Sequence, residues 1–278
     1  MGGEARFSFG GSPWAPRAPA PASQRLPWRG LPATGDTQLS TSSKPGTDRT
    51  NEMTIQLTPL VIIGAGGFGR EILDIVRDIN RAAPTFDFLG FLDDGEANRA
   101  LLERIGAPFL GPSSRLVDLT AGYVIGIGAP GPRRRIDAMA QSWGRQAASL
   151  THPSATIGSD IRVGDGAVIA AGVRLTTNIV VGRFAHINLN CTIGHDTIVG
   201  DFATLHPGVH LGGGCVIGEG ATLGLGSVVL PYLHVGCGAI VGAGAVVVRD
   251  VAPDSTVVGT VARPTLRSRT VGDEVVTE

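Results

Sequence analysis

The chain has 278 residues, of which 42% are hydrophobic, 23 are basic and 24 are acidic. This near balance of charge gives no attraction to nucleic acid or to an anionic membrane, so a small ligand is the better expectation. Three widely spaced cysteines without a CxxC pair argue against a disulfide framework and a thiolate zinc site, and they fit a reducing cytoplasm. No stretch approaches about 18 consecutive apolar residues, so the sequence predicts no membrane-spanning helix.

Residues 1–52 differ in composition from the rest of the chain. They hold seven of its 18 prolines among Ser, Gly, Ala and Arg, without a helix or strand period. Such a segment buries too little apolar surface to offset the entropy of ordering it. A transit peptide is the alternative, although four acidic residues count against it. We predict a disordered tail or an over-extended start over residues 1–53, and a C-terminal tail over residues 265–278.

Alternating strands and helices are predicted next. A buried strand over residues 60–63 leads through GAGGFG into a helix whose apolar residues recur at helical spacing. A second strand ends at Asp93 and Asp94, and YVIGIG at residues 123–128 predicts a later strand that is followed by a helix. This alternation predicts a small Rossmann-like α/β domain over residues 54–148.

The glycine-rich loop of this domain indicates a phosphate-containing ligand. Gly64, Gly66 and Gly69 satisfy GxGxxG between strand and helix, where backbone N–H groups can approach a pyrophosphate. Asp93 and Asp94 end the next strand, where a carboxylate can accept hydrogen bonds from a ribose. The domain has room for roughly one mononucleotide-binding half, so we expect a nucleotide carrying a small group rather than a dinucleotide. A glycine-rich turn without a ligand is the alternative.

A six-residue repeat organises the second half of the chain. Every sixth residue from Ile157 to Val247 is aliphatic, which makes sixteen positions. The third residue after each is Gly, Asn or Asp in thirteen of the sixteen, Asp250 included, and this preference indicates a left-handed backbone conformation. Such a repeat predicts a parallel β-helix over residues 149–264. It resembles left-handed β-helices, and the resemblance implies the hand and three hexads, or 18 residues, per coil.

The pair His195-Asp196 lies inside this repeat. Asp196 falls on the turn position, where an aspartate is an ordinary residue. His195 falls on an outward position that tolerates many residue types, so a plain surface histidine is the alternative. One coil away, Thr177 lies below the histidine and Gly213 above it. We expect the glycine to leave open space and a free N–H beside the imidazole, an arrangement suited to acyl transfer.

The histidines do not predict a metal site within one subunit. Two residues of one column must differ by a multiple of 18, and no two of the following do so: His186, His195, His206, His210 and His234. We therefore expect no metal. Ligands that converge across a subunit interface are the alternative.

Several motifs agree in order and spacing with one enzyme family. They are GAGGFG, FLDD, HPSA at residues 152–155, IN seven residues before HD, and VGTVARP. Over residues 60–264 the chain resembles the sugar acetyltransferases of the sialic acid O-acetyltransferase and bacillosamine-pathway N-acetyltransferase family. The resemblance implies a homotrimer that moves the acetyl group of acetyl-CoA to a sugar. Because a mononucleotide-sized domain precedes the β-helix, we expect the acceptor to be the amine of a nucleotide-activated amino sugar, and the cysteines favour a cytoplasmic protein. The alternatives are O-acetylation of a sugar, as in the sialic acid enzymes, and a non-catalytic trimeric protein that binds a nucleotide-sugar.

The resemblance also implies roles for single residues. His195 is the general base, Asp196 orients it, and Asn188 lies nearby. The nucleotide-sugar is expected at Gly64, Ala65, Gly66, Asp93 and Asp94. The coenzyme is expected at Thr204, Gly213, Leu225 and Ala243. Thr204 stands where members of the family often have a histidine that contacts the coenzyme, and neither His206 nor His186 aligns with that position.

Overall fold

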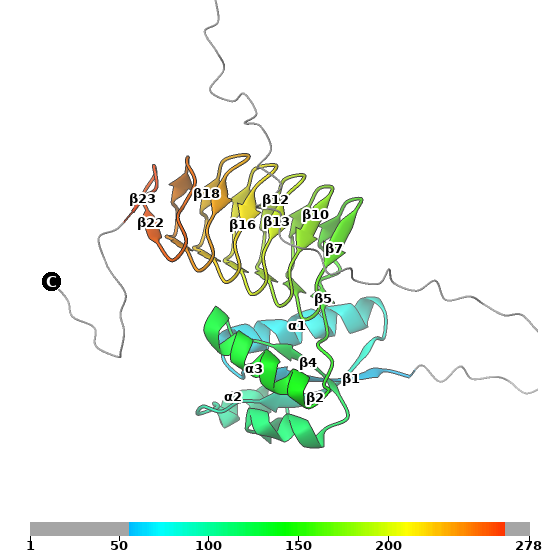
Figure 1. Cartoon of the computed structure of the whole chain (residues 1–278). Helices are drawn as coiled ribbons and strands as arrows, with labels where there is room; N and C mark the ends of the chain where they lie inside the picture. Colours follow the sequence, from blue (N-terminus) through cyan, green and yellow to red (C-terminus); the bar gives the residue numbers. More distant parts are fainter. Residues whose placement is uncertain (1–55, 265–278) are drawn as a thin grey trace, which may run out of the picture. The chain divides into compact units, whose positions relative to one another are not determined.

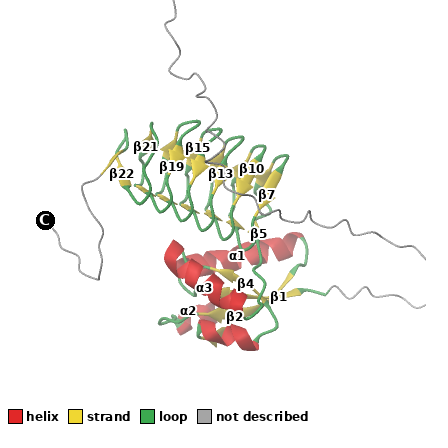
Figure 2. Ribbon diagram, in the orientation of Figure 1, coloured by secondary structure: helices red, strands yellow, loops and turns green. Residues whose placement is uncertain are grey.

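The computed structural model describes residues 56–264, and these belong to one compact unit. An α/β part comes first along the chain, and a stack of short strands follows it (Figure 1). Helices occur only in the first part (Figure 2). The predicted tails over residues 1–53 and 265–278 lie outside the described residues. The limits at residues 54–148 and 149–264 stay predictions.

The α/β part is built on a parallel four-stranded sheet in the order β3-β2-β1-β4. The predicted strand-loop-helix unit and the two later strands are confirmed, whereas α2, β3 and a 3-10 helix were not predicted from the sequence. The elements are β1 (Thr58–Ile63), α1 (Gly67–Ala82), β2 (Phe86–Leu92), α2 (Arg99–Arg104), β3 (Phe109–Gly111), the 3-10 helix (Ser113–Asp118), β4 (Gly122–Ile125) and α3 (Pro130–Ser142).

The second part is the predicted left-handed parallel β-helix, whose strands form three faces. The first face contains β5 (Leu150–Thr151), β8 (Val168–Ile169), β11 (His186–Ile187), β14 (Thr204–Leu205), β17 (Thr222–Leu223), β20 (Ile240–Val241), β22 (Thr256–Val258) and β23 (Arg263–Pro264). The second contains β6 (Thr156–Ile157), β9 (Arg174–Leu175), β12 (Thr192–Ile193), β15 (His210–Leu211), β18 (Val228–Val229) and β21 (Val246–Val247). The third contains β7 (Ile161–Val163), β10 (Ile179–Val181), β13 (Ile198–Val199), β16 (Val216–Ile217) and β19 (His234–Val235).

Strands pair between successive coils in the predicted register. Ile187 of β11 lies between Ile169 and Leu205, each 18 residues away. The repeated aliphatic residues fill the inside of the coils from Ile169 onward, and each of them is at most 4% exposed. Ile157 and Val163 are the exceptions, at 44% and 36%, because they belong to the first coil. Burying such a side chain stabilises the fold by about 1.5–3 kcal/mol, so this column of aliphatic residues supplies the core.

The turn positions adopt the predicted left-handed conformation in every hexad from Asp160 to Gly244. The prediction for Asp250 is wrong. The last coil has 16 residues, since Ile240 pairs with Thr256, and the positive φ moves to Asp254. The period breaks there because two residues are missing from the coil.

Aromatic residues stand at three of these turns, Phe184, Phe202 and Tyr232, and the structure supplies a reason for the first two. Phe184 has a φ of 49° and Phe202 a φ of 56°. The two rings stack at 5.9 Å, and Phe184 also stacks on Tyr123 of β4 at 5.8 Å. A left-handed conformation costs a non-glycine residue roughly 1–2 kcal/mol, and the burial of two rings offsets this cost. The stack joins the β-helix to the α/β part.

A buried arginine makes a second connection between the two parts. Arg133 of α3 is 0% exposed. Its guanidinium donates to the carbonyls of Ile127 (3.0 Å), Gly128 (2.6 Å) and Phe202 (2.5 Å), and to the Thr204 hydroxyl (2.9 Å). It also lies 3.1 Å from Nδ1 of His186. Burial, with a smaller effect of the neighbouring Arg134 charge, lowers the pKa of Arg133 to about 9, so the group stays cationic at neutral pH.

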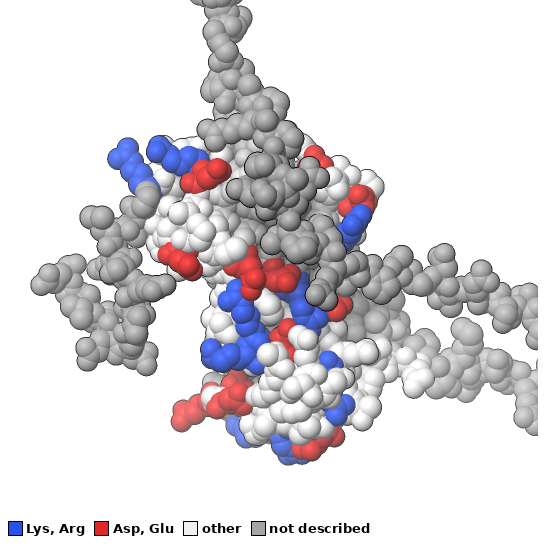
Figure 3. Space-filling model, viewed as in Figure 1, with Lys and Arg blue, Asp and Glu red and all other residues white. Residues whose placement is uncertain are grey.

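Ion pairs between α3 and the β-helix lie around this buried arginine. Arg183 donates to both oxygens of the buried Asp137 carboxylate (2.6 and 2.9 Å), and Arg134 pairs with Glu219 (2.9 Å). Basic and acidic side chains are mixed on the face drawn in Figure 3 and do not gather into a patch of one sign. No helix within residues 56–264 is long and apolar enough to cross a bilayer.

Candidate active site

The predicted catalytic pair lies at the corner between β12 and β13. Nδ1 of His195 is 2.7 Å from Oδ2 of Asp196, and both side chains are about half exposed. The Asn178 side chain donates to the other oxygen of this carboxylate at 2.5 Å. These hydrogen bonds, that from Asn178 first and that from His195 second, hold the pKa of Asp196 below its usual value. The ionised carboxylate accepts a hydrogen bond from Nδ1–H of His195, which leaves Nε2 as the unprotonated, basic nitrogen.

Gly213 lies directly against the imidazole. A Cβ atom built on Gly213 would be 2.5 Å from Nε2 of His195 and 2.6 Å from Cε1. The prediction of open space above the ring is therefore wrong, because the imidazole itself fills the space that the missing Cβ of Gly213 leaves. The N–H of Gly213 donates to none of the described residues, so the expected free donor is present beside the base.

We predict that Gly213→Ala lowers kcat about 10- to 100-fold, less than the roughly 10²- to 10⁴-fold contribution of a positioned base, because the base is displaced and not removed. A Cβ at this distance forces the ring to rotate away from Asp196. The KM for acetyl-CoA and the far-ultraviolet circular dichroism spectrum should change little, since alanine occurs at the equivalent outward positions Ala171 and Ala243.

A double-mutant cycle supplies the control. If the methyl group acts through the ring, Gly213→Ala adds no further loss in the His195→Ala background. Equal losses in both backgrounds would show that the glycine acts independently of His195.

Asn188 is not next to His195 within one chain. It lies at the neighbouring corner, between the first and second faces, where it is 6% exposed and donates to the carbonyl of Leu205 at 3.0 Å. With Phe68, Gly128, Thr204 and His206, among others, it lines a cavity of about 190 Å³. Burial, and to a lesser degree the charge of Arg133, lowers the pKa of His206. The cavity therefore holds a neutral histidine that the sequence did not assign to the site.

The residues expected to contact the coenzyme fall into two groups. Thr204 is 1% exposed, and its hydroxyl donates to the carbonyl of Gly128 (3.0 Å) while it accepts from Arg133. Leu225 and Ala243 are exposed and lie one coil apart at the same corner as Asn188. The N–H groups of Gly213, Leu225 and Ala243 donate to none of the residues in the described part of the chain. Free donors of this kind fit the amide-rich arm of coenzyme A.

The glycines of the GxGxxG motif have different roles. Gly64 has a φ of 105°, and a Cβ on Gly69 would be 1.8 Å from the carbonyl oxygen of Gly64. The backbone turn requires glycine at Gly64, and the close contact between α1 and β1 requires glycine at Gly69. Packing within the protein explains both glycines without a ligand. Gly66 has a φ of –70°, and a Cβ built on it meets nothing within 4 Å. No neighbour among residues 56–264 requires glycine at this position, which fits the approach of a ligand.

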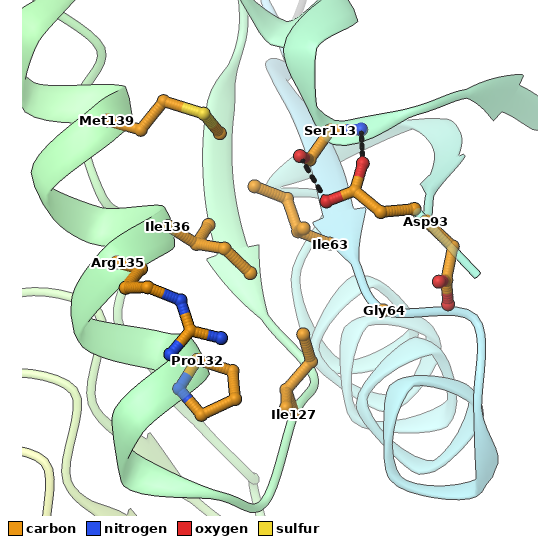
Figure 4. Close-up of a pocket in the computed structure, with 10 residues that line it drawn as sticks. Ile63, Gly64, Asp93, Ser113, Ile127, Pro132, Arg135, Ile136 and Met139 are labelled. Atoms are coloured by element: carbon orange, nitrogen blue, oxygen red, sulfur yellow. Dashed lines mark hydrogen bonds between the residues drawn. The ribbon is translucent and has the colours of Figure 1, made fainter.

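A cavity of about 320 Å³ opens beside this loop at the ends of β1, β2 and β4. Asp93 accepts from the N–H of Ala65 (2.6 Å), and Asp94 accepts from the N–H and the hydroxyl of Ser113 (2.7 Å each). Figure 4 shows the Ser113 bonds and, across the cavity from Asp93, the guanidinium of Arg135 on α3. The Ala65 N–H is thus already bonded within the protein. No sequence motif pointed to Ser113 or Arg135, which stand in segments without a repeat.

Comparison with known proteins assigns the family. The model described as the PglD N-terminal domain matches residues 59–139, and the bacterial transferase hexapeptide (six repeats) model matches residues 196–231. The GDP-perosamine N-acetyltransferase of Escherichia coli O157:H7 is 32% identical over 171 residues, which are 60% of this chain and 76% of that protein. The chain belongs to this family of bacterial sugar N-acetyltransferases. The resemblance found in the sequence is thereby confirmed.

Three solved structures share the fold. PerB from Caulobacter crescentus, in complex with CoA and GDP-perosamine, is 29% identical with a TM-score of 0.68, and the match covers 76% of this chain and 98% of PerB. WeeI from Acinetobacter baumannii AYE is 30% identical with a TM-score of 0.68, over 75% of this chain and all of WeeI. The acetyltransferase domain of PglB from Neisseria gonorrhoeae FA1090, in complex with acetyl coenzyme A, is 28% identical with a TM-score of 0.57, over 76% of this chain and 100% of that domain.

Proposed function

We propose that this chain transfers the acetyl group of acetyl-CoA to the amine of a nucleotide-activated amino sugar, with His195 as the general base. The observation that carries the proposal is the His195-Asp196 pair, whose Nε2 lies beside a free backbone donor at Gly213. The relatives named above support the substrate class, since PerB is in complex with CoA and GDP-perosamine. We also propose that the protein works in the cytoplasm, in keeping with the free thiols of Cys191, Cys215 and Cys237.

The chain's own groups account for the proton transfer. Bound acetyl-CoA supplies an acyl group that is activated as a thioester. Nε2 of His195 accepts a proton from the sugar amine as the amine nitrogen forms the new amide bond. The C–S bond of the thioester breaks, and the departing CoA sulfur takes up the proton that His195 then holds. Asp196 stabilises the resulting imidazolium, and Asn178 holds Asp196 in place. The N–H of Gly213 is positioned to donate to an oxygen that gains negative charge during transfer.

Binding of the two substrates is assigned to separate parts. The nucleotide portion of the sugar binds in the cavity at the ends of β1, β2 and β4, which Gly64, Asp93 and Asp94 line. Ala65 and Gly66 complete the loop beside it. The coenzyme lies along the β-helix corners, on the free N–H groups of Gly213, Leu225 and Ala243. It also passes Thr204, which lines the cavity of about 190 Å³.

We further propose a homotrimer with active sites between copies. Asn188 and His195 lie at different corners of one chain, so only a neighbouring copy brings two such corners together. Val180, Ile198 and Val216 form an outward apolar row on the third face and are each half-buried in a single chain. An apolar row of this kind is typical of an interface. Light scattering on the purified protein measures the assembly, and a monomer that retains full activity would contradict the shared site.

An acceptor screen tests the proposed function. Acetyl-CoA is incubated with GDP-, UDP- and TDP-linked amino sugars and with sialic acid, and released CoA is measured. We expect CoA release with an amino sugar and a product that carries a new amide. A product acetylated on oxygen would establish the O-acetyltransferase alternative instead. Tight nucleotide-sugar binding without CoA release from any acceptor would favour the non-catalytic binding protein.

A further inference from the structure

Three consecutive arginines of α3 face three different surroundings. Side chains of successive helix residues point about 100° apart, so Arg133, Arg134 and Arg135 cannot share one role. Arg133 is buried against the β-helix, and Arg134 pairs with Glu219 and lies over the ring of Phe202. Arg135 is exposed, lines the 320 Å³ cavity and pairs with no carboxylate of the described residues. It is the member of the three whose charge is free for a ligand.

The cavity that Arg135 lines is otherwise acidic. Asp93 and Asp94 are its other charged lining residues within the described part of the chain. Each carboxylate already accepts hydrogen bonds from the protein, Asp93 from Ala65 and Gly95 and Asp94 from Ser113. A diphosphate would add further negative charge to this space. A cation would compensate this charge, and the guanidinium opposite Asp93 is in place to supply it (Figure 4).

We propose that Arg135 binds the diphosphate of the nucleotide-sugar and thereby selects nucleoside diphosphate derivatives over nucleosides. This inference deepens the proposed function and rests on it. The planar guanidinium offers parallel N–H donors that match phosphate oxygens in pairs, which an ammonium group cannot do. The two carboxylates opposite tie the loops of the cavity together, and Arg135 compensates their charge when the diphosphate enters. Arg135 is thus a binding and specificity residue and takes no part in proton transfer.

Steady-state kinetics provide the first test, with the amino sugar found in the acceptor screen. Arg135→Gln should raise the KM for the nucleotide-sugar about 10- to 100-fold, the range for loss of a charged hydrogen bond. The kcat and the KM for acetyl-CoA should stay within about threefold of the wild type, since His195 and the coenzyme site are untouched. Arg135→Lys should fall between the two. Arg134→Gln is the matched control on the same helix, and its KM for the nucleotide-sugar should equal that of the wild type.

Ligand binding provides the second test and does not depend on turnover. Calorimetry compares GDP and UDP with guanosine and uridine on the wild type and on Arg135→Gln. We expect the variant to lose diphosphate affinity and to keep whatever nucleoside affinity the wild type has. Equal losses for diphosphate and nucleoside would place Arg135 at the base or ribose and overturn the proposal, as would no loss at all. A wild type that binds GDP or UDP through Arg135 but acetylates no amine would refute the proposed function alone.

Discussion

Replacing His195 with alanine should lower kcat about 10²- to 10⁴-fold, the usual contribution of a positioned base. The side chain is half exposed, and its outward position carries many other residue types along the β-helix, so the fold should survive. The KM for acetyl-CoA should change little, because the free donors at Leu225 and Ala243 remain. Steady-state kinetics with the best acceptor across pH 6 to 9 measure the effect, and circular dichroism checks the fold.

Asp196→Asn separates a catalytic partner from a turn residue. Asparagine keeps the turn, since Asn178 and Asn190 adopt φ values of 52° and 58° at equivalent positions. The substitution removes the charge that stabilises the imidazolium, so kcat should fall at least about tenfold. Asp160→Asn is a matched control two coils below, with the same left-handed backbone (φ 52°) and no adjacent histidine.

A second control addresses histidine-aspartate pairs as such. His234 lies 3.7 Å from Asp250, and both are as exposed as the catalytic pair. His234→Ala should leave kcat near the wild-type value. Wild-type rates for both His195→Ala and Asp196→Asn would show that the pair is only a turn.

Replacing Arg133 with methionine should lower the free energy of unfolding by about 3–5 kcal/mol. Methionine fills much of the volume but donates no hydrogen bond, so the carbonyls of Ile127 and Phe202 and Nδ1 of His186 stay buried without a donor. Each orphaned acceptor costs roughly 1–3 kcal/mol, and partial rearrangement reduces the sum. Urea unfolding at one fixed protein concentration measures the loss.

Arg134→Met is the matched control for this stability prediction. Its partner Glu219 is about half exposed, and a surface ion pair contributes about 0–1 kcal/mol. Arg133→Lys should fall between the two variants, because an ammonium group keeps the charge and fewer donors. A fully stable Arg133→Met protein would show that the buried guanidinium contributes nothing to holding α3 on the β-helix.

The repeat made most of the β-helix predictable from the sequence. An 18-residue coil places one aliphatic residue inside and one left-handed residue at the turn of each hexad, and both features depend on local physics. The prediction failed where the coil length changes, at Asp250. It held at Phe184 and Phe202, although the turn preference of the residue type does not explain an aromatic residue there. Phe184 occupies such a position because its ring packs on Tyr123, 61 residues earlier in the chain, and the ring of Phe202 packs on Phe184.

The site was predictable only where a motif carried it. The His195-Asp196 contact follows from adjacency on a turn, and Gly213 follows from the column register. No motif in the sequence marks Arg133, Ser113 or Arg135. Because arginines are mostly exposed, the sequence predicts an exposed side chain for every arginine of a polar helix, including one that is buried. Asn188 shows a further limit, because two residues close in sequence occupy different corners of the same coil.

The C-terminal end of the β-helix determines whether another β-helix can add strands to it. An open coil end presents unpaired strand edges, on which another β-helix could stack into a fibre. At the C-terminal end, β22 instead pairs antiparallel with β23, which runs back across the edge and finishes at a proline that has no N–H to offer. The direction reversal ends the ladder of the first face. The edge of the first face is thereby closed to a further parallel strand at this end.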